Sequence, residues 1–233
     1  DDVESRGLGD VYKRQVFMMI VMALGLTACG STVGDITLES GQSAIYIKKD
    51  DTVSYAVSEK FDKDYYDEDD LEDKIEKEVS GYNEGSKASV NDAVSIKDFD
   101  VKKDAATLVL DFATTYDFMT YIRECNNIEA SQFYIGGIAD NSDCKIKGNF
   151  VSPDKKKTAD AKEIKKMTEA NILIVNDAYK VQIEEGAVLF VSDNCKIDED
   201  GIISTPKGED GTGYIVYNLS LIHISEPTRL DVI

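Results

Sequence analysis

The chain has 233 residues, of which 45 are acidic and 26 basic, and its net charge is −19. A balance this acidic disfavours binding to nucleic acid and to anionic membrane surfaces. There is one histidine, His223. A chain this poor in histidine is a weak candidate for histidine-activated nucleophiles and for histidine-ligated zinc or iron sites.

The two ends of the chain are related to each other. Codons can be chosen for residues 219–233 whose reverse complement encodes residues 1–15. Both segments resemble the translated adapter of transposon-based sequencing libraries, so we interpret them, His223 included, as adapter and exclude them from the functional argument. Removing their four basic and six acidic residues leaves a net charge of −17 for residues 16–218. The natural chain is expected to start upstream of Val16.

An uncharged apolar run, Val16–Leu26, is the first element of the remaining sequence. A membrane-spanning helix needs about 20 apolar residues, so this run is too short to span and fits the core of a secretory signal. It ends in Leu26-Thr27-Ala28-Cys29-Gly30, which resembles the lipobox of bacterial lipoproteins. The resemblance implies that residues 16–28 belong to a cleaved signal peptide and that Cys29 becomes a lipidated N-terminus. The Lys-over-Arg bias is similar to that of Gram-positive surface lipoproteins.

The resemblance implies a location as well: the cell membrane, with the body held by its lipid on the extracytoplasmic face. Two acyl chains hold a protein where one is marginal, and an acidic body gains nothing from an anionic bilayer surface. Residues 29–42 are small and polar, and we expect them to form a flexible tether.

The first half of the body, residues 43–126, shows a repeated order of elements. Alternating apolar residues predict hairpins over 43–61 and 93–112. Apolar residues at helical spacing predict helices over 69–82 and 114–126, and Gly81 is the expected stop of the first helix. The sequence therefore predicts a ββα unit twice.

The second half, residues 127–218, is predicted to be rich in strands, with one helix over about Thr158–Glu169. Dense hairpins favour antiparallel pairing, and the fold class is α+β. The pattern leaves open whether there is one continuous sheet or two subdomains divided near residue 127. The expected strands lie in 131–140, 144–151, 171–175, 179–183, 187–192, 201–205 and 213–217.

The acidic run at residues 61–73 is the sharpest charge feature. Asp62 and Asp64 fit the first and third ligand positions of an EF-hand calcium loop. Tyr66 stands at the fifth position, Asp67 at the glycine position and Asp73 at the terminal glutamate position, so the match fails. We interpret the run as a solvated helix N-terminus, with Asp62 and Asp64 as weak calcium candidates only.

Three cysteines follow Cys29, namely Cys125, Cys144 and Cys195, and none has CxxC spacing. Their odd number allows one disulfide plus a free thiol in an exported chain, but the apolar face around Cys125 favours a buried thiol. No cofactor or metal site is predicted.

Two functions remain open. The first is a non-enzymatic envelope module that binds an unknown ligand or envelope protein, and no nucleic acid. The alternative is a histidine-free, glycosidase-like hydrolase that uses two carboxylates. Two carboxylates about 5–10 Å apart in a deep cleft, one with a raised pKa, would favour the enzyme. No catalytic residue is assigned from the sequence.

Overall fold

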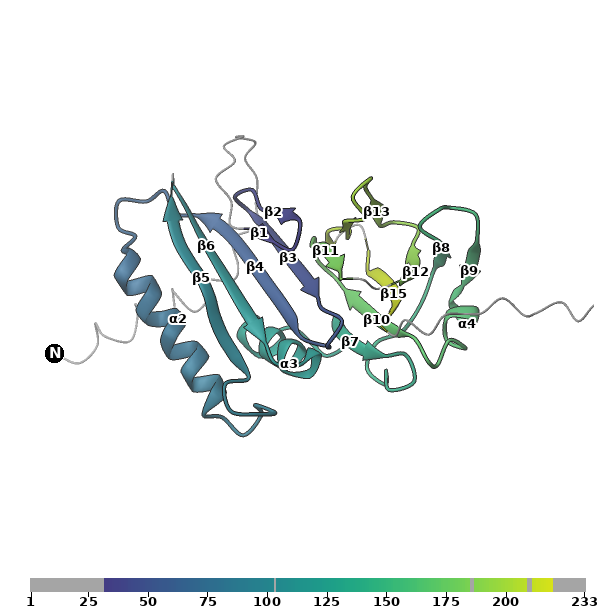
Figure 1. Ribbon diagram of the computed structural model, residues 1–233, viewed down its shortest axis with the longest axis horizontal. Helices are drawn as coiled ribbons and strands as arrows, with labels where there is room; N and C mark the ends of the chain where they lie inside the picture. The colour runs from purple at the N-terminus through teal and green to yellow at the C-terminus, as the bar shows by residue number, and fades with distance from the viewer. Residues whose placement is uncertain (1–31, 103, 185–186, 209–210, 220–233) are drawn as a thin grey trace, which may run out of the picture.

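The computed structural model describes residues 32–102, 104–184, 187–208 and 211–219. Within them the chain has an α+β fold of mainly antiparallel strands and three helices (Figure 1). The helices are α2 (Glu68–Asn83), α3 (Thr115–Cys125) and the short α4 (Ala161–Ile164).

A seven-stranded sheet forms one part of the body (Figure 1). Its central strands alternate, so that Tyr55, Leu110 and Phe112 on one face are buried in the main core. In sheet order the strands are β13 (Lys196–Ile197), β14 (Ile203–Ser204), β11 (Lys180–Ile183), β3 (Gln42–Ile47), β4 (Val53–Lys60), β6 (Ala105–Phe112) and β5 (Val94–Lys102).

A six-stranded, wholly antiparallel sheet forms the other part. Its two faces contribute to different cores, because Ile135 and Leu173 join the main core while Ile172 and Ile174 pack with Ile164 of α4. In sheet order the strands are β7 (Phe133–Gly137), β10 (Asn171–Val175), β15 (Gly213–Asn218), β12 (Ala187–Ser192), β8 (Asn149–Val151) and β9 (Thr158–Asp160).

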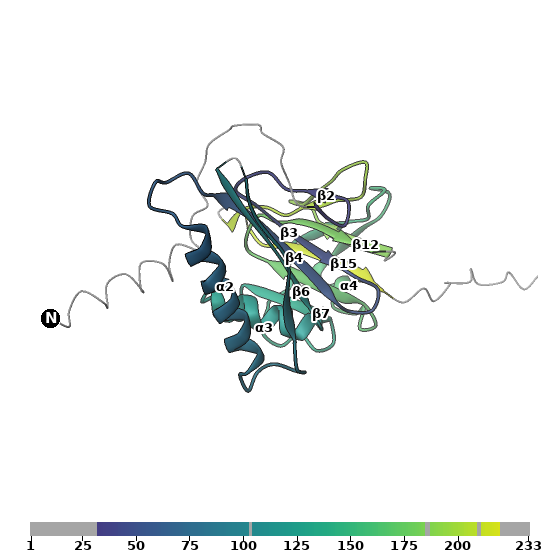
Figure 2. The same cartoon turned by 60° about the vertical axis from the view of Figure 1, so that its left-hand side comes forward.

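The two sheets share one core, and α3 lies where they meet. Phe118 of α3 is fully buried, with its ring centroid 5.1 Å from that of Phe112 on β6 and 5.5 Å from that of Phe133 on β7. Helices α2 and α3 cover the same face of the seven-stranded sheet (Figure 2). Aromatic edge-to-face pairs of this kind add to the burial energy of the core.

Helix α2 begins at a carboxylate cap. The Asp67 side chain accepts a hydrogen bond from the Asp70 backbone N–H at 3.0 Å, and acidic residues fill the first turn, where the helix dipole favours them. Ile75, Val79 and Tyr82 are buried and lie on the stripe that faces the sheet. The helix runs through Gly81, the expected stop, and ends at Asn83.

Several expectations differ from the structure. The question left open at residue 127 has a specific answer in the sheet order, because β11, β13 and β14 from the second half of the chain lie in the seven-stranded sheet with strands of the first half. Strand β11 lies beside β3 in parallel, with Val181 opposite Ile45, although antiparallel pairing was expected. Local sequence patterns carry no information about such a distant pair.

The expected third helix, Thr158–Glu169, is wrong for most of its length. Residues 158–160 pair as strand β9 with β8, and only residues 161–164 are helical. The helix begins at a capping box, in which Asp160 and Glu163 satisfy each other's backbone N–H groups. The strand expected over 144–151 is confined to residues 149–151.

The flexible tether expected for residues 29–42 is also wrong where the structure describes it. The strands β1 (Thr32–Val33) and β2 (Ile36–Thr37) form a hairpin. Val33, Ile36 and Leu38 are at most 1% exposed and pack on the outer face of the seven-stranded sheet. Burial of three large apolar side chains holds this segment to the body.

Candidate functional site

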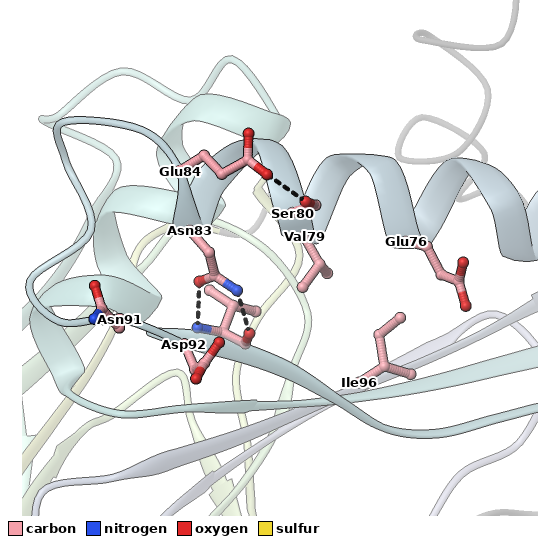
Figure 3. A pocket seen from close by; sticks show the side chains of 9 residues that line it. Glu76, Val79, Ser80, Asn83, Glu84, Asn91, Asp92 and Ile96 are labelled. Carbon is pink, nitrogen blue, oxygen red and sulfur yellow. Dashed lines mark hydrogen bonds between the residues drawn. The ribbon is translucent and has the colours of Figure 1, made fainter.

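A groove of about 530 Å³ lies between α2 and the start of β5 (Figure 3). It is open to solvent along one side. The lining residues are the acidic Glu76, Glu84 and Asp92, the polar Ser80, Asn83 and Asn91, and the apolar Val79, Val94 and Ile96.

The side chain of Asn83, the last residue of α2, joins the helix to the strand. Its Nδ2 donates to the Val94 carbonyl at 2.8 Å, and the Val94 backbone N–H donates to Asn83 Oδ1 at 3.0 Å (Figure 3). The amide thus bonds both backbone groups of one strand residue, as a neighbouring strand would. This pair holds one end of the groove at a fixed width.

The loop between α2 and β5, residues 84–93, is held by a buried carboxylate. Asp117 on α3 is 0% exposed, and its Oδ1 accepts from the Ser89 backbone N–H at 2.9 Å. The hydroxyls of Ser89 and Thr114 both donate to its Oδ2. A buried carboxylate needs such donors because it has lost its hydration. The loop therefore has a fixed position on α3.

The same loop supplies Asn91 and Asp92 to the groove, and Val90 beside them is 49% exposed. Val90 is one of three large apolar residues that are exposed in the described part of the chain, with Tyr65 and Tyr116. A fixed loop with an exposed apolar side chain next to a groove is suited to contact with another molecule.

The charge of the groove is wholly acidic, since its charged lining residues are Glu76, Glu84 and Asp92. The Ser80 hydroxyl donates to Glu84 Oε1 at 3.0 Å and orients that carboxylate. Like charges facing one open space attract a cation there, and the effect falls as salt rises. The groove therefore combines an acidic lining, which attracts positive charge, with the apolar side chains of Val79, Val94 and Ile96.

A second carboxylate, that of Glu59, has an unusual environment outside the groove. Glu59 is on β4, in register with the buried Val53 and Tyr55, and burial raises its pKa to about 7. Burial raises the pKa of Tyr55 to about 12. A hydrogen bond with the Ser43 hydroxyl acts in the opposite direction, and the charge of Glu59 raises the pKa further. Within the described residues, the Glu59 carboxylate has no hydrogen bond or ion pair.

The residues singled out from the sequence do not come together. Cys29 and His223 lie outside the described residues. Asp62 forms an exposed ion pair with Lys63, whose Nζ is 3.3 Å from Asp62 Oδ1, and Asp64 is exposed. Among the residues that the structure describes, no three His, Cys, Asp or Glu side chains are grouped as a metal site would require.

The cysteines Cys125, Cys144 and Cys195 are free thiols in the structure. Burial raises the pKa of each thiol, and for Cys125 the neighbouring Glu78 adds to the effect. Thiols that resist ionisation are poor nucleophiles. Cys125, expected to be a buried thiol, is partly buried and packs against the main core.

Sequence reasoning missed both the groove and Glu59. The groove depends on tertiary packing of α2 against β5, and no local pattern indicates it. Glu59 does leave a signal, because it continues the period-two apolar register of Val53, Tyr55 and Val57. A carboxylate in that register is predicted to face the core.

Comparison with known proteins adds no relative, since no protein-family model, curated protein or solved structure matches the chain. Among the described residues, no helix is both long and apolar enough to cross a membrane.

Proposed function

We propose that this protein is a lipid-anchored, extracytoplasmic binding module that holds a positively charged segment of a partner in the groove between α2 and β5. The lipid would be attached at Cys29. The observation that carries the binding role is the composition of the groove, whose charged residues are all carboxylates. We further propose that residues 43–126 are organised as two successive ββα units. The order of the elements in this part of the chain, β3-β4-α2 and then β5-β6-α3, supports this organisation.

The geometry supports binding more than catalysis. Glu84 and Asp92 line an open groove, and a raised pKa belongs to Glu59, which is not among the lining residues. A glycosidase-like site requires the two carboxylates to flank one scissile bond. The arrangement therefore favours recognition of a cation.

Binding is tested with the full chain and an unstructured oligolysine peptide, by calorimetry at low and high salt. We expect binding at low salt that weakens as salt rises, and a loss of affinity in Glu76→Gln. Asp70→Asn removes the same charge from α2 outside the groove and serves as the matched control. Equal losses of affinity in the two variants would show that only the net charge of the chain matters, and would refute the groove as the binding site.

The anchor is tested separately by cell fractionation. Cys29→Ser removes the sulfur that would carry the lipid, and the variant is expected in the soluble fraction while the parent protein sediments with membranes. Sedimentation of the variant with membranes would contradict the anchor and leave the groove experiment unaffected.

The hydrolase alternative has one observation in its favour, the raised pKa of Glu59. A carboxyl with a pKa near 7 is half protonated at neutral pH and can act as a general acid. Its test is hydrolysis of aryl glycosides by the full chain and by Glu59→Gln. Turnover by the parent protein that is lost in the variant would establish this alternative over the binding module.

A further inference from the structure

We propose that the partner is an extended basic segment of another protein, which pairs with the outer edge of β5 as an additional strand. This inference rests on the proposed function, because it names the partner of the same groove. Three features carry it: the free edge of β5, the role of Asn83 and the charge beside the edge.

Strand β5 is at the edge of the seven-stranded sheet and pairs with β6 alone. The Ala113 backbone N–H donates to the Ala93 carbonyl at 2.9 Å, so the backbone groups of Ala93 face β6. In an antiparallel ladder the direction alternates, which turns the backbone groups of Val94 and Ile96 outward. After the register shift at Lys97, the pairing resumes with Asp98 opposite Val109, and the same alternation turns the backbone groups of Phe99 and Val101 outward.

Asn83 already behaves as a neighbouring strand at the first of these positions, since its amide bonds both the N–H and the carbonyl of Val94. Within the described part of the chain, the outward backbone groups of Ile96, Phe99 and Val101 have no such partner. The edge is therefore closed at one end and open for pairing along the rest of β5.

The groove lies beside the first open position, because Ile96 lines it together with Glu76 and Asp92 (Figure 3). Side chains of an added strand alternate between the two faces of the sheet. Those on the α2 side would meet the carboxylates of the groove, while those on the other side would meet the mixed charges of Lys97 and Asp100. The fitting segment therefore has a basic residue on the α2 side next to Ile96, where Glu76 lines the groove.

A second copy of this chain is a poor occupant. Two copies of residues 16–218, with a net charge of −17 each, would repel one another. The charge therefore selects a basic partner that differs from the chain itself.

The experiment uses the full chain and two peptides of alternating lysine and threonine. The second peptide is N-methylated at the residues whose N–H groups would pair, so it keeps the charge and loses the strand donors. Affinity is measured by fluorescence anisotropy, and protection of the Ile96, Phe99 and Val101 amides by hydrogen exchange. Loss of two hydrogen bonds is expected to weaken binding at least about tenfold.

Tenfold weaker binding of the methylated peptide, with protection of the three amides by the unmodified one, supports strand addition. Equal affinities without protection would overturn strand addition and leave the cation-binding groove standing. Failure of both peptides to bind would overturn strand addition and the proposed groove function together. Glu76→Gln is expected to weaken both peptides, and Asp70→Asn neither.

Discussion

Glu59→Gln is expected to stabilise the protein at alkaline pH. Burial raises the pKa of Glu59 from an ordinary 4.5 to about 7 in the folded chain. Between these values the unfolded chain has released the proton and the folded chain retains it, so the free energy of unfolding falls as pH rises. Above pH 7 the Glu59 carboxylate is charged in the folded chain as well, and its burial lowers the free energy of unfolding by the full amount. A glutamine at this position stays neutral and does not lower it.

The magnitude follows from the two pKa values. At 1.36 kcal/mol for each pH unit, their separation gives about 3.4 kcal/mol as an upper limit. Because Glu59 is only half-buried, water screens its charge, and we expect about 1–2 kcal/mol at pH 8. At pH 5 the difference between variant and parent should fall to about a quarter of that value.

Urea unfolding of the parent protein and the variant at pH 5 and pH 8 measures both differences. Glu199→Gln, at an exposed turn, is the control and should change stability little and equally at the two pH values. A Glu59→Gln variant that is no more stable than the parent at pH 8 would refute the reasoning. So would a gain of the same size at both pH values.

Three further predictions concern stability and are measured by urea unfolding at one pH. Asn83→Ala leaves both bonded backbone groups of Val94 without their partner and should cost about 1–3 kcal/mol, whereas Asn91→Ala, also in the groove, should cost little. Ile36→Ala empties a fully buried site under the N-terminal hairpin and should cost about 2–4 kcal/mol. Asp117→Asn replaces the buried carboxylate oxygen that accepts from the Ser89 and Thr114 hydroxyls and should cost about 1–3 kcal/mol, with faster proteolysis of the 84–93 loop. Changes below about 0.5 kcal/mol, the size of ordinary surface substitutions, would contradict each of them.

The α+β class could be predicted from the sequence because its hairpins are local. Val53, Tyr55 and Val57 alternate with polar residues, and their strand pairs with the one directly before it. Helix α2 was predicted for a similar reason, since Ile75 and Val79 recur at helical spacing. In both cases the residues that specify the element are close together in the chain.

Long-range pairing could not be predicted. Val181 lies beside Ile45 in a parallel pair, and nothing within either segment specifies the other. The sequence predicts a tether where the hairpin at residues 32–37 lies, because Val33 and Ile36 are separated by small and polar residues that mask the pattern. Their burial depends on the exposed apolar face of the sheet, which exists only after folding.

The candidate site was missed for a related reason. In the sequence, Glu76 is one of many acidic residues on a predicted helix and is expected to face solvent. Asn83 is expected only to lie near the end of that helix. Only the packing of α2 beside an edge strand gives these two residues a shared surface.

The N-terminal hairpin also bears on the geometry of the proposed lipid anchor. The first strand of the hairpin begins at Thr32, three residues after Cys29 in the sequence. With the lipid on Cys29, even an extended chain of that length reaches only about 10 Å, close to the distance of about 8 Å over which physiological salt screens charge. In the proposed location, an anionic headgroup layer would repel the acidic α2 and turn it away from the bilayer, and this electrostatic orientation would present the groove to other proteins.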